Sequence, residues 1–167
     1  GTVMTNMGFS KFCEANGIDF VSTKVGDRYV LESMLQNGYN IGGEQSGHII
    51  FLDHSTTGDG ELSGAMLLSI MKRTGEKLSD LAKIMERYPQ VLINVKVSNE
   101  GKLSFYTDKE VKAEINRVTE ILGDTGRILV RVSGTEPLVR VMLEGENLEQ
   151  IQTLAEEAAQ VVRERLA

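Results

Sequence analysis

The chain has 167 residues, of which 41% are hydrophobic and 25% charged, and it contains 17 Gly, 2 Pro and one Cys. This composition is typical of a globular protein and excludes collagen, coiled coils and disordered tails. Its net charge of −6 gives no general affinity for a phosphate backbone, so we expect no nucleic-acid partner.

Three features that the sequence lacks bear on the cellular compartment of the protein. No apolar run approaches the length of a membrane span, and the first residues lack the basic-then-apolar order of a signal peptide. Cys13 has no second cysteine in the chain to pair with. We therefore expect a cytoplasmic protein with no membrane partner. Because the chain starts directly in strand-like sequence without Met, we expect a fragment of something longer.

The first half alternates strand-like and helical patterns, which predicts an α/β layer architecture. One helix follows Asp27, predicted as its N-cap, and stops at Gly38, predicted as the residue after its end. The other elements expected here are strands at residues 18–22 and 48–52, a helix after Asp59 and a helix over residues 79–87.

The second half has the order β-α-β-β-α, which predicts an antiparallel sheet with two helices on one face. Thr107 and Glu110 are expected to form a capping box before the first helix, and Asn147 to open the second. Strands are expected at residues 92–97, 127–132 and 138–143, with residues 103–106 pairing against the first across a turn at 99–101. Pro89 indicates a hinge at residues 88–90.

The loop between the last two expected strands is a candidate phosphate site. Its segment reads Arg131-Val132-Ser133-Gly134-Thr135-Glu136-Pro137, and Arg140 follows. Two hydroxyls and a glycine in a tight loop offer N–H and O–H donors, while arginines add charged, bidentate contacts. Arg131 and Ser133 are expected on one side of their strand. The alternative is a plain hairpin turn with solvated arginines.

A second candidate is the loop Gly42-Gly43-Glu44-Gln45-Ser46-Gly47-His48. Its carboxylate, amide, hydroxyl and imidazole groups could hold the adjacent hydroxyls of a sugar, and its glycines allow close approach to the backbone. The alternative is a polar turn that satisfies local backbone groups, in which His48 is a structural histidine.

A third segment places Lys24 and Arg28 beside the start of the helix at Asp27, where an anion is favoured. The alternative is that Asp27 only caps the helix and that both cations are solvated. No group of Cys, His or carboxylate residues has the spacing of a metal site.

These loops resemble those of the α-D-phosphohexomutases, and within them the bacterial phosphoglucosamine mutases. Gly43 to His48 is similar to the sugar-recognition loop of that family, and Arg131 to Arg140 to its phosphate-binding loop. The likeness continues through Val25 to Val30 and so covers essentially the whole chain. Members have four domains, and the resemblance implies most of the third at residues 1–88 and the fourth at 89–167.

The resemblance implies a fold class and an activity. The fold is a three-layer α/β sugar-binding domain with a mixed sheet, followed by a smaller α+β domain with an antiparallel sheet and two helices. The activity is that of an isomerase that interconverts glucosamine 6-phosphate and glucosamine 1-phosphate through a bisphosphate, towards cell-wall precursors. The family's phosphoserine and Mg²⁺-binding aspartates lie in its first two domains, and neither motif occurs here, so this chain alone should be inactive.

The resemblance also implies residue roles. Glu44 and Ser46 should contact ring hydroxyls, Lys24, Asp27 and Arg28 the sugar, and His48 should transfer a proton or support the phosphoserine. The residues expected to hold phosphate are Arg131, Ser133, Gly134, Thr135 and Arg140. The expected partners are the phosphosugar and the preceding domains, and a homodimer is left open. Gln45 favours the glucosamine branch, with a phosphomannomutase, a phosphoglucomutase or a non-catalytic phosphosugar-binding module as alternatives.

Overall fold

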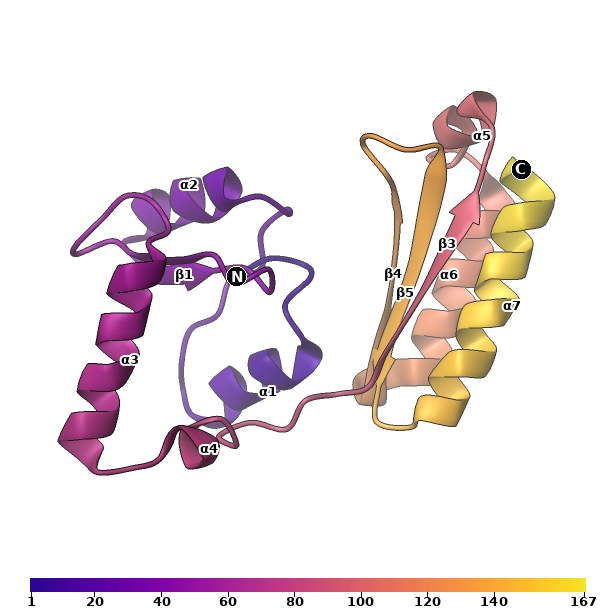
Figure 1. The fold of residues 1–167 in the computed structure, drawn as a ribbon. Helices are drawn as coiled ribbons and strands as arrows, with labels where there is room; N and C mark the ends of the chain where they lie inside the picture. The colour runs from indigo at the N-terminus through magenta and orange to yellow at the C-terminus, as the bar shows by residue number, and fades with distance from the viewer. The chain divides into compact units, whose positions relative to one another are not determined.

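A computed structural model describes all of residues 1–167 and divides the chain into two compact units, Gly1–Arg87 and Tyr88–Ala167 (Figure 1). We call them unit 1 and unit 2. Neither unit contains a helix that is both long and apolar enough to cross a membrane.

Unit 1 combines four helices with a small hairpin, and its α/β class confirms the expectation. Strands β1 and β2 pair antiparallel, and a single parallel bridge joins Thr2 to Thr23. Gly38 has a left-handed backbone with φ of 73°, as expected for the residue that ends α2. The elements are α1 (Met7–Ala15), α2 (Asp27–Asn37), β1 (Ile41–Gly43), β2 (Ile49–Phe51), α3 (Gly60–Thr74) and α4 (Leu78–Leu81).

Three local predictions for unit 1 are wrong. Residues 18–22 form no strand, because the neighbouring N-terminal segment offers only the one bridge at Thr23. The helix expected over residues 79–87 stops at Leu81; it buries no residue, and a short helix without packing gains little stability. Asp27 is the first residue of α2, and Gly26 takes the cap position without a side-chain bond.

The core of unit 1 is small. Val30 and Met34 of α2 and Ile50 of β2 are buried together, while α3 buries none of its residues. Gly42 permits this packing, because a Cβ atom there would lie 2.4 Å from the Met34 sulfur and 2.7 Å from a Val30 methyl. The hairpin is thereby held directly against α2.

Unit 2 contains a three-stranded antiparallel sheet in the order β3-β5-β4, so the three long strands predicted from sequence are confirmed. Strand β5 pairs in register with both neighbours, from Leu138 to Glu144 with β3 and from Val139 to Gly145 with β4. The elements are β3 (Gln90–Lys96), α5 (Asn99–Ser104), α6 (Lys109–Leu122), a short 3₁₀ turn (Gly123–Thr125), β4 (Gly126–Val132), β5 (Leu138–Gly145) and α7 (Leu148–Leu166).

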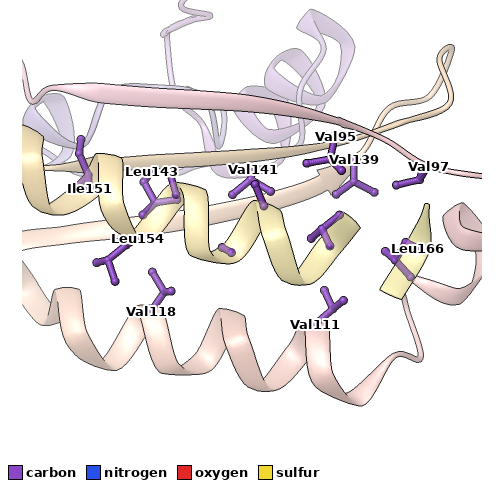
Figure 2. Close-up of a cluster of buried hydrophobic side chains, with 14 of the residues drawn as sticks. Val95, Val97, Val111, Val118, Val139, Val141, Leu143, Ile151, Leu154 and Leu166 are labelled. Atoms are coloured by element: carbon purple, nitrogen blue, oxygen red, sulfur yellow. The ribbon is translucent and has the colours of Figure 1, made fainter. Parts of the chain in front are cut away.

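Helices α6 and α7 cover one face of this sheet, as expected, and Asn147 caps α7 by accepting from the Gln150 N–H (Figure 1). Alternate residues of β5, Val139, Val141 and Leu143, are fully buried on that face. Figure 2 shows them packed with residues of α6 and α7. The alternation of side chains along β5 places Arg140 on the opposite face.

Two predictions for unit 2 are wrong. Residues 99–104 form helix α5 in place of a turn leading to a strand at 103–106, because Ser98 caps the segment by accepting from the Gly101 N–H. The cap of α6 is Asp108 rather than Thr107 with Glu110. Its carboxylate accepts from the Val111 and Glu110 N–H groups, and the Val111 bond is the main cause that lowers the pKa of Asp108.

The replacement Gly101→Ala tests the contact of α5 with the end of α7. A Cβ atom there would lie 1.9 Å from the Leu166 carbonyl oxygen, so backbone must move. Alanine gains up to about 1 kcal/mol of helix propensity, but overpacking costs about 1–3 kcal/mol. We expect a net loss of stability in chemical denaturation of unit 2. The control Gly134→Ala meets nothing within 4 Å and should leave stability within about 0.5 kcal/mol. Equal stability of the two variants would contradict the packing.

Candidate functional site

The polar loop of unit 1 is the turn of the β1–β2 hairpin. It closes through a bond from the Glu44 N–H to the His48 carbonyl at 2.8 Å and one from the Gly47 N–H to the Glu44 carbonyl at 3.0 Å. Gly47 has φ of 96°, a conformation that side-chain-bearing residues rarely adopt. Gly43 is also required, since its Cβ would lie 2.7 Å from the His48 oxygen. The loop thus presents Glu44, Gln45 and Ser46 in a defined turn.

Glu44 links this loop to the start of α2. Its Oε1 accepts from the backbone N–H of Gly26 at 2.9 Å, at the N-cap of the helix. A helix N-terminus favours an anion, and here the anion is the protein's own carboxylate. The bond occupies one carboxylate oxygen, and Oε2 has no protein partner.

His48 and Asp27 also bring the loop and α2 together. The His48 Nε2 lies 3.6 Å from the Asp27 Oδ2 and makes no hydrogen bond, although this atom is buried. The imidazole packs on Gly58, where a Cβ would lie 2.3 Å from two ring atoms. Gly58 therefore positions His48, a role that the sequence did not reveal because Gly58 sits outside both predicted loops.

The other predicted residues of unit 1 lie at the surface. The Arg28 Nε donates to Glu32 at 3.0 Å, and this bond is the main cause that raises the pKa of Arg28. Lys24 and Arg28 both lie over the Tyr29 ring, at 5.9 and 5.8 Å from its centroid. Ser46 is exposed, with no hydrogen bond to the protein. The structure thus brings Glu44, His48 and Asp27 together around the start of α2, with the two cations beside them.

A cavity of about 620 Å³ also lies in unit 1. Its lining surface is mostly apolar and includes Phe9, Phe20 and Met34. Glu44 and Gln45 are among the polar residues that also line it. Ser46, His48 and the two cations take no part in it. The cavity and the polar loop therefore share only Gly42, Gly43, Glu44 and Gln45.

The candidate phosphate loop of unit 2 connects β4 to β5. The Ser133 N–H donates to the Leu138 carbonyl at 2.8 Å, and the Ser133 Oγ accepts from the Glu136 N–H at 3.3 Å. Ser133 is buried, and its hydroxyl proton is still free to donate. Gly134 and Thr135 are exposed, and their backbone N–H groups donate to no protein acceptor. Two adjacent free N–H groups form an anion-binding feature.

Arg131 and Arg140 are directly paired across β4 and β5, so both side chains start from the same face of the sheet. The Arg140 Nη2 donates to the Glu136 Oε2 at 2.8 Å, while Arg140 Nε is buried without an acceptor. Arg131 has neither an ion pair nor a hydrogen bond through its side chain. Two like charges opposite each other are unfavourable, and a bound anion would relieve that repulsion.

Sequence reasoning missed two further residues at this loop. The Lys102 Nζ donates to the Glu136 carbonyl at 2.9 Å, which ties α5 to the loop, and the Glu136 carboxylate contacts Arg140. The contact of Glu136 with Arg140 could have been suspected from the sequence, because the two residues are four positions apart. Lys102 gave no signal, because its segment was expected to be a turn.

The chain contains no group of three or more His, Cys, Asp or Glu side chains that could hold a metal ion.

Comparison with protein families gives a match to each unit. A family model described as phosphoglucomutase/phosphomannomutase, alpha/beta/alpha domain III matches residues 1–88. A second, described as phosphoglucomutase/phosphomannomutase, C-terminal domain, matches residues 92–161.

Curated relatives include the phosphoglucosamine mutases of Caldanaerobacter subterraneus subsp. tengcongensis, 53% identical over 99% of this chain, and of Clostridioides difficile, 52% identical over 99%. In both cases the chain spans 37% of the relative's length. Among solved structures, Aspergillus fumigatus N-acetylphosphoglucosamine mutase has a TM-score of 0.86 at 19% identity, over 98% of this chain and 38% of that one. The same enzyme in complex with GlcNAc-6P and magnesium has a TM-score of 0.81 at 18% identity, over 99% of this chain and 38% of that one. These structures support the fold.

The replacement Gly58→Ala tests the positioning of His48. The added methyl would overlap the imidazole, so the ring should rotate away from Asp27. We expect the His48 ring signals in NMR spectra to shift while those of His54 stay unchanged. Because the imidazole is 40% exposed and free to move, the stability loss should stay near 1 kcal/mol. The matched control Gly60→Ala, which meets nothing within 4 Å, should leave His48 unshifted. Unshifted His48 signals in Gly58→Ala would show that Gly58 does not set the ring position.

Proposed function

The chain belongs to the phosphoglucomutase/phosphomannomutase family, and from this premise we propose that it is the sugar- and phosphate-binding part of a phosphoglucosamine mutase. The whole enzyme interconverts glucosamine 6-phosphate and glucosamine 1-phosphate through a bisphosphate intermediate. The names of the relatives at 52–53% identity support this substrate, and Gln45 agrees with it.

The observation that carries the proposal is the paired arginines beside a loop with unused donors. Arg131 and Arg140 converge from neighbouring strands, and the N–H groups of Gly134 and Thr135 stay free at the exposed turn. Ser133 adds a hydroxyl that is already oriented by its bond to Glu136. Guanidinium, amide and hydroxyl donors together match the oxygens of a phosphate monoester. In our proposal this loop holds the phosphate that is not being transferred.

Unit 1 supplies the sugar contacts in this proposal. Glu44, oriented by the Gly26 N–H, has one free oxygen to accept from a ring hydroxyl, and Ser46 lies two residues further along the same turn. Lys24, Asp27 and Arg28 line the adjacent helix start and contact the sugar. His48 transfers a proton or supports the phosphoserine from its place beside Asp27.

The remaining chemistry belongs to parts of the enzyme beyond these residues. The chain spans 37% of its relatives and gathers no metal-binding group of its own. We place the phosphoserine and Mg²⁺ in the preceding domains, and the hinge between the two domains described here at residues 88–90. Phosphoryl transfer depends mostly on positioning and charge, so binding domains contribute strongly to its rate. We also propose a cytoplasmic location, which the single buried Cys13 supports.

The replacement Arg131→Ala tests the phosphate loop. Loss of a charged hydrogen bond costs about 1.5–3 kcal/mol, which corresponds to about 10- to 100-fold weaker binding. We expect this loss when inorganic phosphate is titrated into the 167-residue chain and followed through the Gly134 and Thr135 amide signals. Arg163→Ala removes the same charge from α7, where the arginine pairs with Glu156, and should leave phosphate affinity unchanged. Equal binding by wild type and Arg131→Ala would remove Arg131 from the site.

A second experiment tests the division of labour. The isolated chain should show no interconversion of glucosamine 6-phosphate and glucosamine 1-phosphate in a coupled assay, since it brings neither phosphoserine nor metal site. The full-length protein, containing the same residues, serves as the positive control. Turnover by the 167-residue chain alone would contradict the assignment of the chemistry to other domains.

A further inference from the structure

The guanidinium of Arg140 is only half satisfied along one edge. Nε and Nη2 form a fork of two parallel donors, which suits a carboxylate or a phosphate. Nη2 donates to the Glu136 Oε2 at 2.8 Å, but Nε is buried and has no acceptor. A buried donor of a charged group that is left unpaired costs free energy. The fork therefore lacks one acceptor in the free protein.

A carboxylate can fill such a fork completely, as another pair in unit 2 shows. The Arg117 Nε donates to the Glu114 Oε2 at 2.8 Å and its Nη2 donates to the Glu114 Oε1 at 2.7 Å. Glu114 lies within helix α6, whereas Glu136 belongs to a loop that is held at several points. Its N–H donates to Ser133 Oγ, and its carbonyl accepts from Lys102 Nζ and the Leu138 N–H.

The local charge favours an additional anion. Arg131 and Arg140 face each other across the strands, and Lys102 bonds the backbone of the same loop. The one ion pair among these cations is that of Arg140 with Glu136. The Glu136 side chain is 52% exposed, so it can swing into solvent at little cost. Three cations against one movable carboxylate leave a net positive site.

We propose that Glu136 is an internal occupant of the phosphate site, which the phosphate of the substrate displaces from Arg140. In the free protein its carboxylate keeps Arg140 oriented and partly offsets the Arg131 repulsion. When phosphate binds, its oxygens accept from both Nε and Nη2, and Glu136 moves into solvent. The displaced carboxylate disfavours weak single-contact anions and selects for a doubly charged phosphate monoester. This inference rests on the proposed phosphate-binding function of the loop.

The alternative role for Glu136 is that of a permanent brace. In that case the carboxylate keeps its contact with Nη2 in the bound state and phosphate uses Nε alone. The two roles predict opposite effects when the charge of Glu136 is removed. Loss of an occupant strengthens phosphate binding, whereas loss of a brace weakens it.

The test is a titration of inorganic phosphate into the 167-residue chain, followed by the Gly134 and Thr135 amide signals and the Arg140 Nε–H signal. We expect Glu136→Gln to bind phosphate about two- to fivefold more tightly than wild type, the size of effect expected for a partly exposed ion pair. Glu136→Ala should change affinity in the same direction. Glu120→Gln, which removes the same charge from an exposed position of α6, should leave the affinity unchanged.

A second measurement uses the wild type alone. Saturation with phosphate should shift the side-chain carboxyl signal of Glu136 towards that of a solvated glutamate. An unshifted carboxyl signal, equal or weaker binding by Glu136→Gln, or an equal gain in Glu120→Gln would each overturn the inference while leaving the phosphate site in place. Absence of saturable binding to the wild type would instead overturn the proposed function of the loop.

Discussion

The double pairing of strand β5 is the constraint on which unit 2 depends. Because β5 is bonded in register to β3 on one side and β4 on the other, its side chains cannot change faces without breaking both ladders. One face therefore buries Val139, Val141 and Leu143 under the helices, and the other carries Arg140. The same register places Arg131 directly opposite Arg140. The hydrophobic core thus determines the position of the two charges. The favourable free energy of packing the core offsets the electrostatic repulsion between them.

The segments of unit 1 are held in place more by close contacts at glycine residues than by a large hydrophobic core. The one buried hydrophobic cluster of unit 1 consists of Val30, Met34 and Ile50. The cluster of unit 2 is larger and draws on the three-stranded sheet and two long helices. Gly42 lets the hairpin approach α2 closely, and Gly58, in the segment before α3, lies directly against the His48 ring. Such contacts depend on the absence of a side chain, so a single methyl group disturbs them. We therefore expect the polar loop of unit 1 to be the more sensitive of the two candidate loops to small substitutions.

The sequence predicted the elements whose stability is decided locally or by strong periodicity. The alternating strands of unit 2, the final helix capped by Asn147 and the left-handed Gly38 were all found where expected. Two failures were local, since the caps of α2 and α6 lie one residue away from the predicted positions. Others occurred where tertiary contacts contribute. Residues 103–106 are strand-like, yet residues 99–104 form a helix in which Gly101 packs against the backbone of Leu166, 65 residues away in sequence. Residues 18–22 failed for the opposite reason, because a strand pattern needs a neighbour that runs beside it.

Both candidate loops were identified from sequence, but the partners of their side chains were not. Composition and order suffice to show that Glu44 lies in a polar turn, whereas its bond to Gly26 depends on how α2 packs on the hairpin. Glu136 was recognised only as part of a motif, and its contact with Arg140 follows from the loop's bonds to Ser133 and Lys102. Local sequence therefore gives the chemistry of each group, and the fold decides which groups remain available to a ligand.

The two carboxylates illustrate opposite uses of the same group. Glu44 accepts from a helix N-terminal N–H, a donor that no hydroxyl ligand needs, so the bond orients the remaining oxygen without competing with the sugar. Glu136 accepts from Arg140, the donor that phosphate uses in our proposal, so in that proposal its bond is exchanged when the ligand binds. A carboxylate that is oriented by a donor the ligand does not use lowers the entropic cost of binding that ligand. A carboxylate that occupies a donor the ligand does use lowers affinity and raises selectivity. In the proposed reaction the bisphosphate intermediate turns round in the site, so a strong anchor on both ends would slow turnover. Moderate affinity for phosphate combined with firm positioning of the sugar contact satisfies both requirements.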